Sequence, residues 1–188
     1  LTSSNLEERL SLETTKMAEF AGLDGYQAQV KYEELDENVG GNISLNNSSE
    51  KVIRINISDK FKGNVNATLA VLAHEICHKV LFVNGLYVSL ELMNEVYTDL
   101  TTIYIGFGEL ITKGYRTISS DKATHQNRVH LLGYLTPETY KVTNEMILSV
   151  FEHTTENQEY TDPYAEETIK KWSKNEDKQA VIRTCFIE

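Results

Sequence analysis

The chain has 188 residues, 40% hydrophobic and 24% charged, which is typical of one globular domain with a substantial core. Its net charge of −10 argues against nucleic acid and anionic membrane as main partners, because both attract basic proteins. No apolar run is long enough to predict a transmembrane helix. Of the two cysteines, one lies in a helix expected to be buried, which argues against a disulfide framework and favours a cytoplasmic, reducing compartment.

The first third of the chain is expected to form one helix and three strands. Residues 4–21 place apolar side chains at helical spacing, and residues 26–34 alternate apolar and polar as a half-buried strand does. Residues 42–46 and 52–58 alternate again around a turn, which predicts a hairpin. Because one face of 52–58 is polar, we expect it to be a sheet edge that could pair with an extended peptide. An ordinary two-faced strand would show the same pattern.

The remaining part of the chain is expected to be mainly helical. Asn66 is a candidate cap for the helix that follows it, and a second helix covers about 89–105. Residues 109–127 predict short helical or loop elements. Thr136 and Pro137 open a third helix, since threonine caps helices well and proline is tolerated in the first turn.

These elements predict an α+β domain. A small antiparallel sheet, with strands near 26–34, 42–46 and 52–58, would pack on the helices. We expect this domain to cover residues 1–155. Residues 156–188 are polar and charged, so they are expected to form an extension that packs on the domain or links it to a further part.

The central feature of the sequence is an HExxH motif within residues 69–83, LAVLAHEICHKVLFV. His74 and His78 are four residues apart, so they lie about 40° apart around a helix and one turn from each other. Their imidazoles can therefore converge on one zinc ion, and Glu75 can reach a zinc-bound water. The other positions of this helix are largely apolar, which predicts that it is buried and that its three polar side chains need partners.

The same motif could also occur without a metal, in two ways. One is a chance match, although with five histidines and 28 acidic residues in the chain fewer than about 0.02 HExxH matches are expected by chance. The other is a pair of core histidines that are satisfied by hydrogen bonds alone.

A third zinc ligand is expected, because catalytic zinc usually takes three ligands from protein. The pattern HExxHxxGxxH is excluded, since Leu81 and Asn84 stand at its glycine and last histidine positions. The second helix instead offers Glu95 and Asp99, four residues apart on one face. Glu95 is a candidate ligand, and Asp99 is a candidate acceptor for the second N–H of a zinc-bound histidine, with His74 the first choice.

HExxH followed on the next helix by NExxxD resembles the gluzincin, or thermolysin-like, zinc metallopeptidases. The resemblance covers residues 52–105 and implies a zincin-like fold and a minimal bacterial metallopeptidase domain. It implies His74, His78 and Glu95 as metal ligands, Glu75 as general base and Asp99 as the residue behind a ligand. The chain departs from the family in its short separation between His78 and Glu95 and in lacking an alignable second domain.

The expected reaction is zinc-dependent hydrolysis of a peptide or protein substrate. Glu75 would take a proton from the zinc-bound water as it attacks a carbonyl. A further donor would stabilise the oxyanion. The candidates are His125, His130, Tyr115 and Tyr134, and we place His130 first because it precedes a predicted loop.

Two other functions compete with a peptidase. A zinc-stabilised interaction domain without turnover is disfavoured by the intact Glu75, since a structural site has no use for a base. A zinc hydrolase acting on a non-peptide amide is disfavoured by the half-polar strand 52–58, which suits a peptide better.

Overall fold

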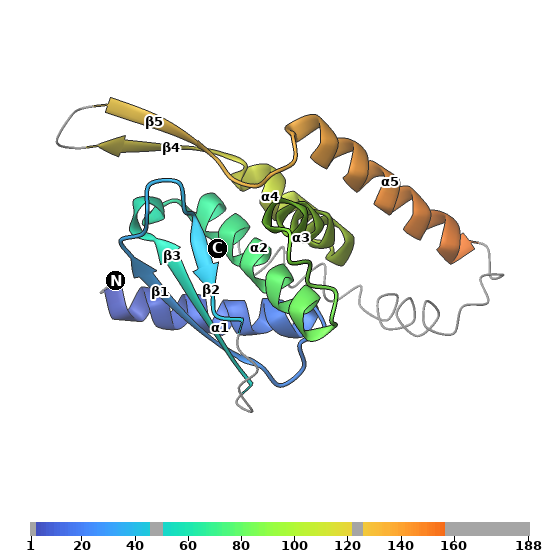
Figure 1. Cartoon of the computed structure of the whole chain (residues 1–188), viewed down its shortest axis with the longest axis horizontal. Coiled ribbons are helices and arrows are strands. Elements are labelled where there is room, and N and C mark those ends of the chain that lie inside the picture. Colours follow the sequence, from blue (N-terminus) through green and yellow to red (C-terminus); the bar gives the residue numbers. More distant parts are fainter. Residues whose placement is uncertain (1–2, 46–50, 122–125, 157–188) are drawn as a thin grey trace. The chain divides into compact units, whose positions relative to one another are not determined.

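The computed structural model describes residues 3–45, 51–121 and 126–156 (Figure 1). The chain divides into two compact units, residues 1–144 and 145–188, and the second is described only through residue 156. The fold is α+β, as predicted. In chain order the elements are α1 (Ser3–Phe20), β1 (Gln27–Glu33), β2 (Gly41–Ile43), β3 (Val52–Ser58), the short 3-10 helix η1 (Asp59–Phe61), α2 (Val65–Val83), α3 (Glu91–Ile105), α4 (Gly108–Gly114), β4 (Arg116–Asp121), β5 (Gln126–Leu131) and α5 (Pro137–Glu156).

The main sheet has the strand order β1-β3-β2 and is mixed. Strand β2 pairs antiparallel with β3, which confirms the hairpin, but β1 and β3 run parallel. The prediction of a wholly antiparallel sheet is therefore wrong, because β3, the second strand of the hairpin, pairs in parallel with β1. The prediction that 52–58 is an edge is wrong for the same reason, since β3 is paired on both sides.

Helix α1 closes the outer edge of β1. Alternate amides of β1 donate hydrogen bonds to side chains of α1 instead of to another strand. These bonds run from Ala28 to Thr15 Oγ1 (2.9 Å), from Val30 to Ser11 Oγ (2.9 Å) and from Tyr32 to Glu7 Oε1 (3.1 Å). A peptide could therefore not add to this sheet at β1, and β2 is the strand at its other edge.

Helix α2 forms the centre of the core. It packs on the sheet face that carries Ile53, Ile55 and Ile57, all completely buried. Most residues of α2 are buried as well, as its apolar composition predicted. The cap is Asn64 and not Asn66: the Asn64 side chain accepts a hydrogen bond of 3.1 Å from the backbone amide three residues later.

The elements after α2 hold the second half of the site. Helix α3 packs on α2 and ends at Gly106, whose left-handed conformation (φ 105°) suits glycine. The short helix α4 follows as predicted. The strands β4 and β5 form an antiparallel hairpin that the sequence did not predict. Helix α5 begins as predicted, with Thr136 Oγ1 accepting the amide of Thr139 at 3.2 Å. Among the described residues, no helix has the length and apolarity needed to cross a membrane.

Candidate metal centre

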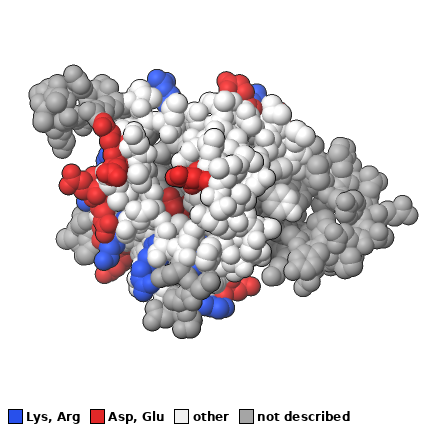
Figure 2. Space-filling model, in the orientation of Figure 1, with Lys and Arg blue, Asp and Glu red and all other residues white. Residues whose placement is uncertain are grey.

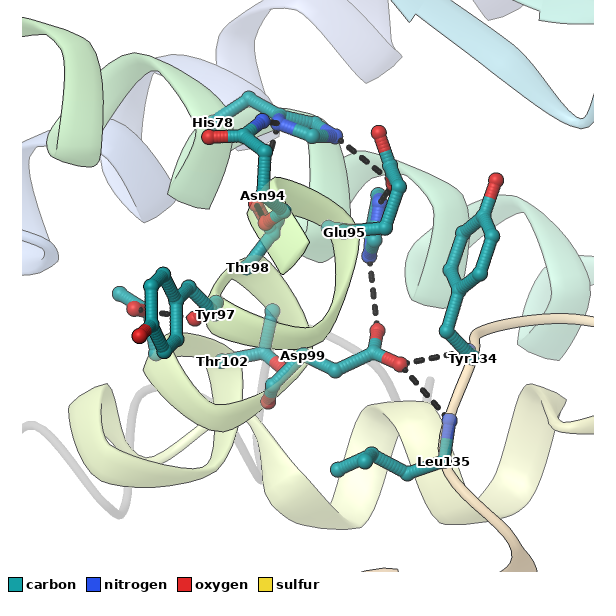
Figure 3. A network of polar contacts seen from close by, with 11 residues as sticks. His78, Asn94, Glu95, Tyr97, Thr98, Asp99, Thr102, Tyr134 and Leu135 are labelled. Carbon is teal, nitrogen blue, oxygen red and sulfur yellow. Dashed lines mark hydrogen bonds and ion pairs between the residues drawn. The ribbon is translucent and has the colours of Figure 1, made fainter. Parts of the chain in front are cut away.

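Helices α2 and α3 bring His74, His78 and Glu95 together. One ligand atom from each residue lies within 4.8 Å of the other two. Glu95 Oε2 is 3.0 Å from His74 Nε2 and 3.3 Å from His78 Nε2. The three residues predicted as zinc ligands therefore converge where α2 and α3 pack together. Figure 3 shows two of them, His78 and Glu95, turned toward each other.

These separations fit a tetrahedral metal. Two ligands that each lie about 2.1 Å from a tetrahedral zinc are about 3.4 Å apart, close to both distances at Glu95. Two imidazoles and one carboxylate form a donor set that zinc accepts, and three protein ligands leave a fourth position for water or substrate. The residues present thus fit a catalytic zinc, while nickel, cobalt or ferrous iron could use the same donors.

Asp99 contacts His74 at Nδ1, the ring nitrogen that does not face Glu95. Its Oδ1 is 3.0 Å from His74 Nδ1, which is the contact expected from the sequence, and the Asp99 side chain is completely buried. Burial alone would lower the pKa of His74, but the hydrogen bonds to Asp99 and Glu95 outweigh it and raise this pKa to about 10. Without a metal, His74 is therefore a protonated imidazolium between two carboxylates.

Glu95 and Asp99 respond in the opposite direction. Burial would raise the pKa of Glu95, but its hydrogen bonds with His74 and His78 lower it to about 2. Burial likewise opposes ionisation of Asp99, yet the hydrogen bond from His74 lowers the pKa of this carboxyl below its ordinary value. Both carboxylates are thus ionised at neutral pH. A carboxylate that binds a metal needs this charge, and so does one that accepts the N–H of a metal-bound histidine.

His78 has different partners from His74. Its Nδ1 lies 3.0 Å from Thr98 Oγ1 and 3.2 Å from Asn94 Nδ2, and both partners are buried on α3 (Figure 3). Neither residue was predicted from the sequence to belong to the site. Their spacing held a usable signal, because Asn94 and Thr98 are four residues apart and so face α2 from the same side of α3.

Glu75 lies beside the ligands but makes no hydrogen bond to them within the described part of the chain. Its side chain is 6% exposed, and both histidines act on it electrostatically. Burial raises the pKa of Glu75, an effect that the charges of His74 and His78 reduce in part. A buried carboxylate of this kind, next to a metal site, can accept a proton.

Strand β2 passes directly beside Glu75. A Cβ atom added at Gly41 would lie 3.2 Å from Glu75 Oε1 and would collide with Val71. Glycine therefore allows the strand to approach α2 this closely.

The outer edge of β2 is formed by backbone groups of Gly41 and Ile43. The residues before and after this pair are hydrogen-bonded to β3. The Gly40 carbonyl accepts the Ser58 amide at 2.9 Å, and the Ser44 amide donates to the Arg54 carbonyl at 3.1 Å. By the alternation of an antiparallel pair, the backbone groups of Gly41 and Ile43 point away from β3.

A loop after β5 forms another side of the site. Asp99 Oδ2 accepts the backbone amides of Tyr134 (2.6 Å) and Leu135 (3.1 Å). The Tyr134 ring lies in a stacked position on His74, with centroids 6.4 Å apart and planes at 24°. Burial and the nearby carboxylates, Glu95 foremost, raise the pKa of Tyr134, so its hydroxyl keeps its proton.

The structure places the four candidate oxyanion donors differently. Tyr134 stacks on the proposed ligand His74, whereas the His130 ring packs edge-on against Phe61, with centroids 5.8 Å apart. Tyr115 packs edge-on against Tyr140, a buried residue of α5. His125 lies outside the described residues. Tyr134 is therefore the candidate that this geometry favours, although the sequence placed His130 first.

Acidic atoms mark the middle of one face of the molecule. In Figure 2, two small groups of acidic atoms lie within a largely uncharged area, while further Asp and Glu atoms and the Lys and Arg atoms lie toward its margins.

No protein-family model matches the chain, and no curated protein or solved structure matches it either.

Proposed function

We propose that the chain is a zinc-dependent peptide hydrolase with a zincin-like arrangement of the gluzincin type. His74, His78 and Glu95 would hold the metal, with Asp99 orienting His74. When bound, zinc acidifies water and polarises a carbonyl group. The reaction proposed is hydrolysis of a peptide bond.

The observation that carries this proposal is the position of Glu75, a buried carboxylate beside the three proposed metal ligands. A purely structural zinc site is closed by four ligands and needs no further carboxylate. Here a buried carboxylate stands beside a three-residue ligand set, with its pKa raised by burial. We infer that Glu75 takes the proton from the attacking water and later delivers it to the leaving amine.

Two further features support a peptide as the substrate. The outer edge of β2 presents backbone groups of Gly41 and Ile43, and Gly41 lies beside Glu75. An extended peptide can pair with such an edge. Tyr134 stands against His74 with its hydroxyl protonated, so it is a candidate donor for the developing oxyanion. We propose Tyr134 for this role in place of His130.

Cobalt substitution tests whether the metal has an open position. The visible spectrum of bound Co²⁺ depends on its ligands, so it should change when acetohydroxamate, a small metal-binding probe, is added. A structural site with four protein ligands would not respond. An unchanged spectrum in protein that holds one cobalt per chain would overturn the hydrolase and favour an interaction domain without turnover.

A further inference from the structure

The hydroxyl of Thr98 lies between His78 and the backbone of its own helix. Thr98 Oγ1 is 3.0 Å from His78 Nδ1 and 2.8 Å from the carbonyl oxygen of Asn94, and the residue is completely buried. A threonine hydroxyl has one proton to donate and can accept others. The two contacts are satisfied together if Oγ1 donates to the carbonyl and accepts from His78.

Asn94 cannot serve as this acceptor in the observed arrangement. Its Oδ1 accepts the backbone amide of Val88 at 3.2 Å, so its NH2 group is turned toward His78 Nδ1, at 3.2 Å. An amide NH2 only donates hydrogen bonds, so this contact by itself favours the tautomer whose Nδ1 is unprotonated. When His78 Nδ1 carries a proton, Thr98 is therefore the acceptor that this pocket provides.

Metal binding decides where that proton must be. Glu95 Oε2 lies on the Nε2 side of His78, so Nε2 is the nitrogen that faces the ligand cluster. Nε2 can bind a metal only through its lone pair, and the ring proton must then lie on Nδ1.

We propose that Thr98 is a positioning residue that stabilises the metal-binding tautomer of His78 against the opposing Asn94 NH2 donor, through a relay from Nδ1–H to Oγ1 and from Oγ1–H to the Asn94 carbonyl. The relay ends one residue before Glu95, so it also ties the α2 ligand to the helical turn that carries the α3 ligand. The inference rests on the proposed metal site. Thus His74 is oriented by a carboxylate and His78 by a neutral hydroxyl.

The test compares the zinc affinity of wild type, Thr98→Val and Thr98→Ser by competition with a chelator. Valine keeps the shape and removes the hydroxyl, so zinc should bind about 10–100-fold more weakly. Serine keeps the hydroxyl and should restore affinity close to wild type. Thr101→Val is the matched control, because Thr101 Oγ1 donates to the Tyr97 carbonyl at 2.7 Å on the same helix. It should leave zinc affinity unchanged.

Each outcome has a distinct meaning. Absence of zinc binding by wild type would overturn the proposed metal site itself. Wild-type affinity in Thr98→Val, or an equal loss in Thr98→Ser, would overturn only the role of Thr98. If Thr98→Val does not fold, nitrogen-15 NMR of the zinc-loaded wild type decides. A proton on His78 Nδ1 with metal at Nε2 supports the relay, and the reverse assignment refutes it.

Discussion

Asp99 has two functions that substitution can separate. One carboxylate oxygen contacts His74, and the other accepts the amides of Tyr134 and Leu135. In Asp99→Asn, the side-chain oxygen can still accept the two amides, so the NH2 group must face His74 Nδ1. Because NH2 only donates, Nδ1 must then be unprotonated, and the ring proton moves to Nε2, where the metal should bind.

We therefore expect Asp99→Asn to weaken zinc binding by about 10–100-fold, the usual effect of losing the partner behind a metal-bound histidine. This corresponds to about 1.4–2.8 kcal/mol, at about 1.4 kcal/mol per factor of ten. Asp99→Ala should weaken zinc binding as well. It also leaves two partly buried amides without an acceptor, which should lower the free energy of unfolding by a further about 1–3 kcal/mol relative to the asparagine variant.

Chelator competition measures the zinc affinity, and urea unfolding of the metal-free proteins measures stability. Wild-type zinc affinity in Asp99→Asn would refute the argument that this carboxylate sets the tautomer of His74. Equal stabilities of the asparagine and alanine variants would refute the argument that the carboxylate holds the loop after β5.

Three further predictions follow from individual contacts. Since the pKa of metal-free His74 is raised to about 10, zinc binding at pH 8 should release about one proton. Calorimetry in buffers of different ionisation enthalpy measures this proton. For the same reason, the metal-free fold should lose stability as the pH rises from about 6.5 to about 10. Gly41→Ala should destabilise the fold by about 1–3 kcal/mol in urea unfolding, because the added Cβ would overlap Val71. Gly40→Ala is the control that should be tolerated, because its Cβ would lie 3.4 Å or more from its neighbours. Tyr134→Phe should lower the turnover number of peptide hydrolysis by about 10²-fold while zinc affinity stays unchanged, and equal turnover would exclude it as the oxyanion donor.

The sequence predicted the parts of the site that depend on helical spacing. HExxH fixes two imidazoles one turn apart, and the face shared by Glu95 and Asp99 follows from their separation of four residues. The crossing of α2 and α3 then needed only to bring these faces together, and the expected contact between Asp99 and His74 is present at 3.0 Å.

The features that the sequence did not predict depend on pairing between distant segments. Alternation in 52–58 reports that one face is buried, but it does not tell whether other strands pair on both sides, so the same pattern fits an edge and a central strand. The contact of Gly41 with α2 likewise requires the packed structure. In β4 and β5, residues 116–121 and 126–131 are largely polar and lack the apolar alternation that marks a strand pair.

Replacement of Glu75 by glutamine tests whether this carboxylate is the general base of a zinc-dependent hydrolase. Because burial raises the pKa of Glu75, a neutral side chain of the same shape should preserve the fold and the bound zinc. Wild type and Glu75→Gln, with zinc content measured on the same samples, are each incubated with a peptide library prepared from a digested proteome, and the products are identified by mass spectrometry. We expect zinc-dependent cleavages by wild type that fall by at least about 10²-fold in Glu75→Gln. Equal cleavage by both proteins, or none by zinc-loaded wild type, would contradict it.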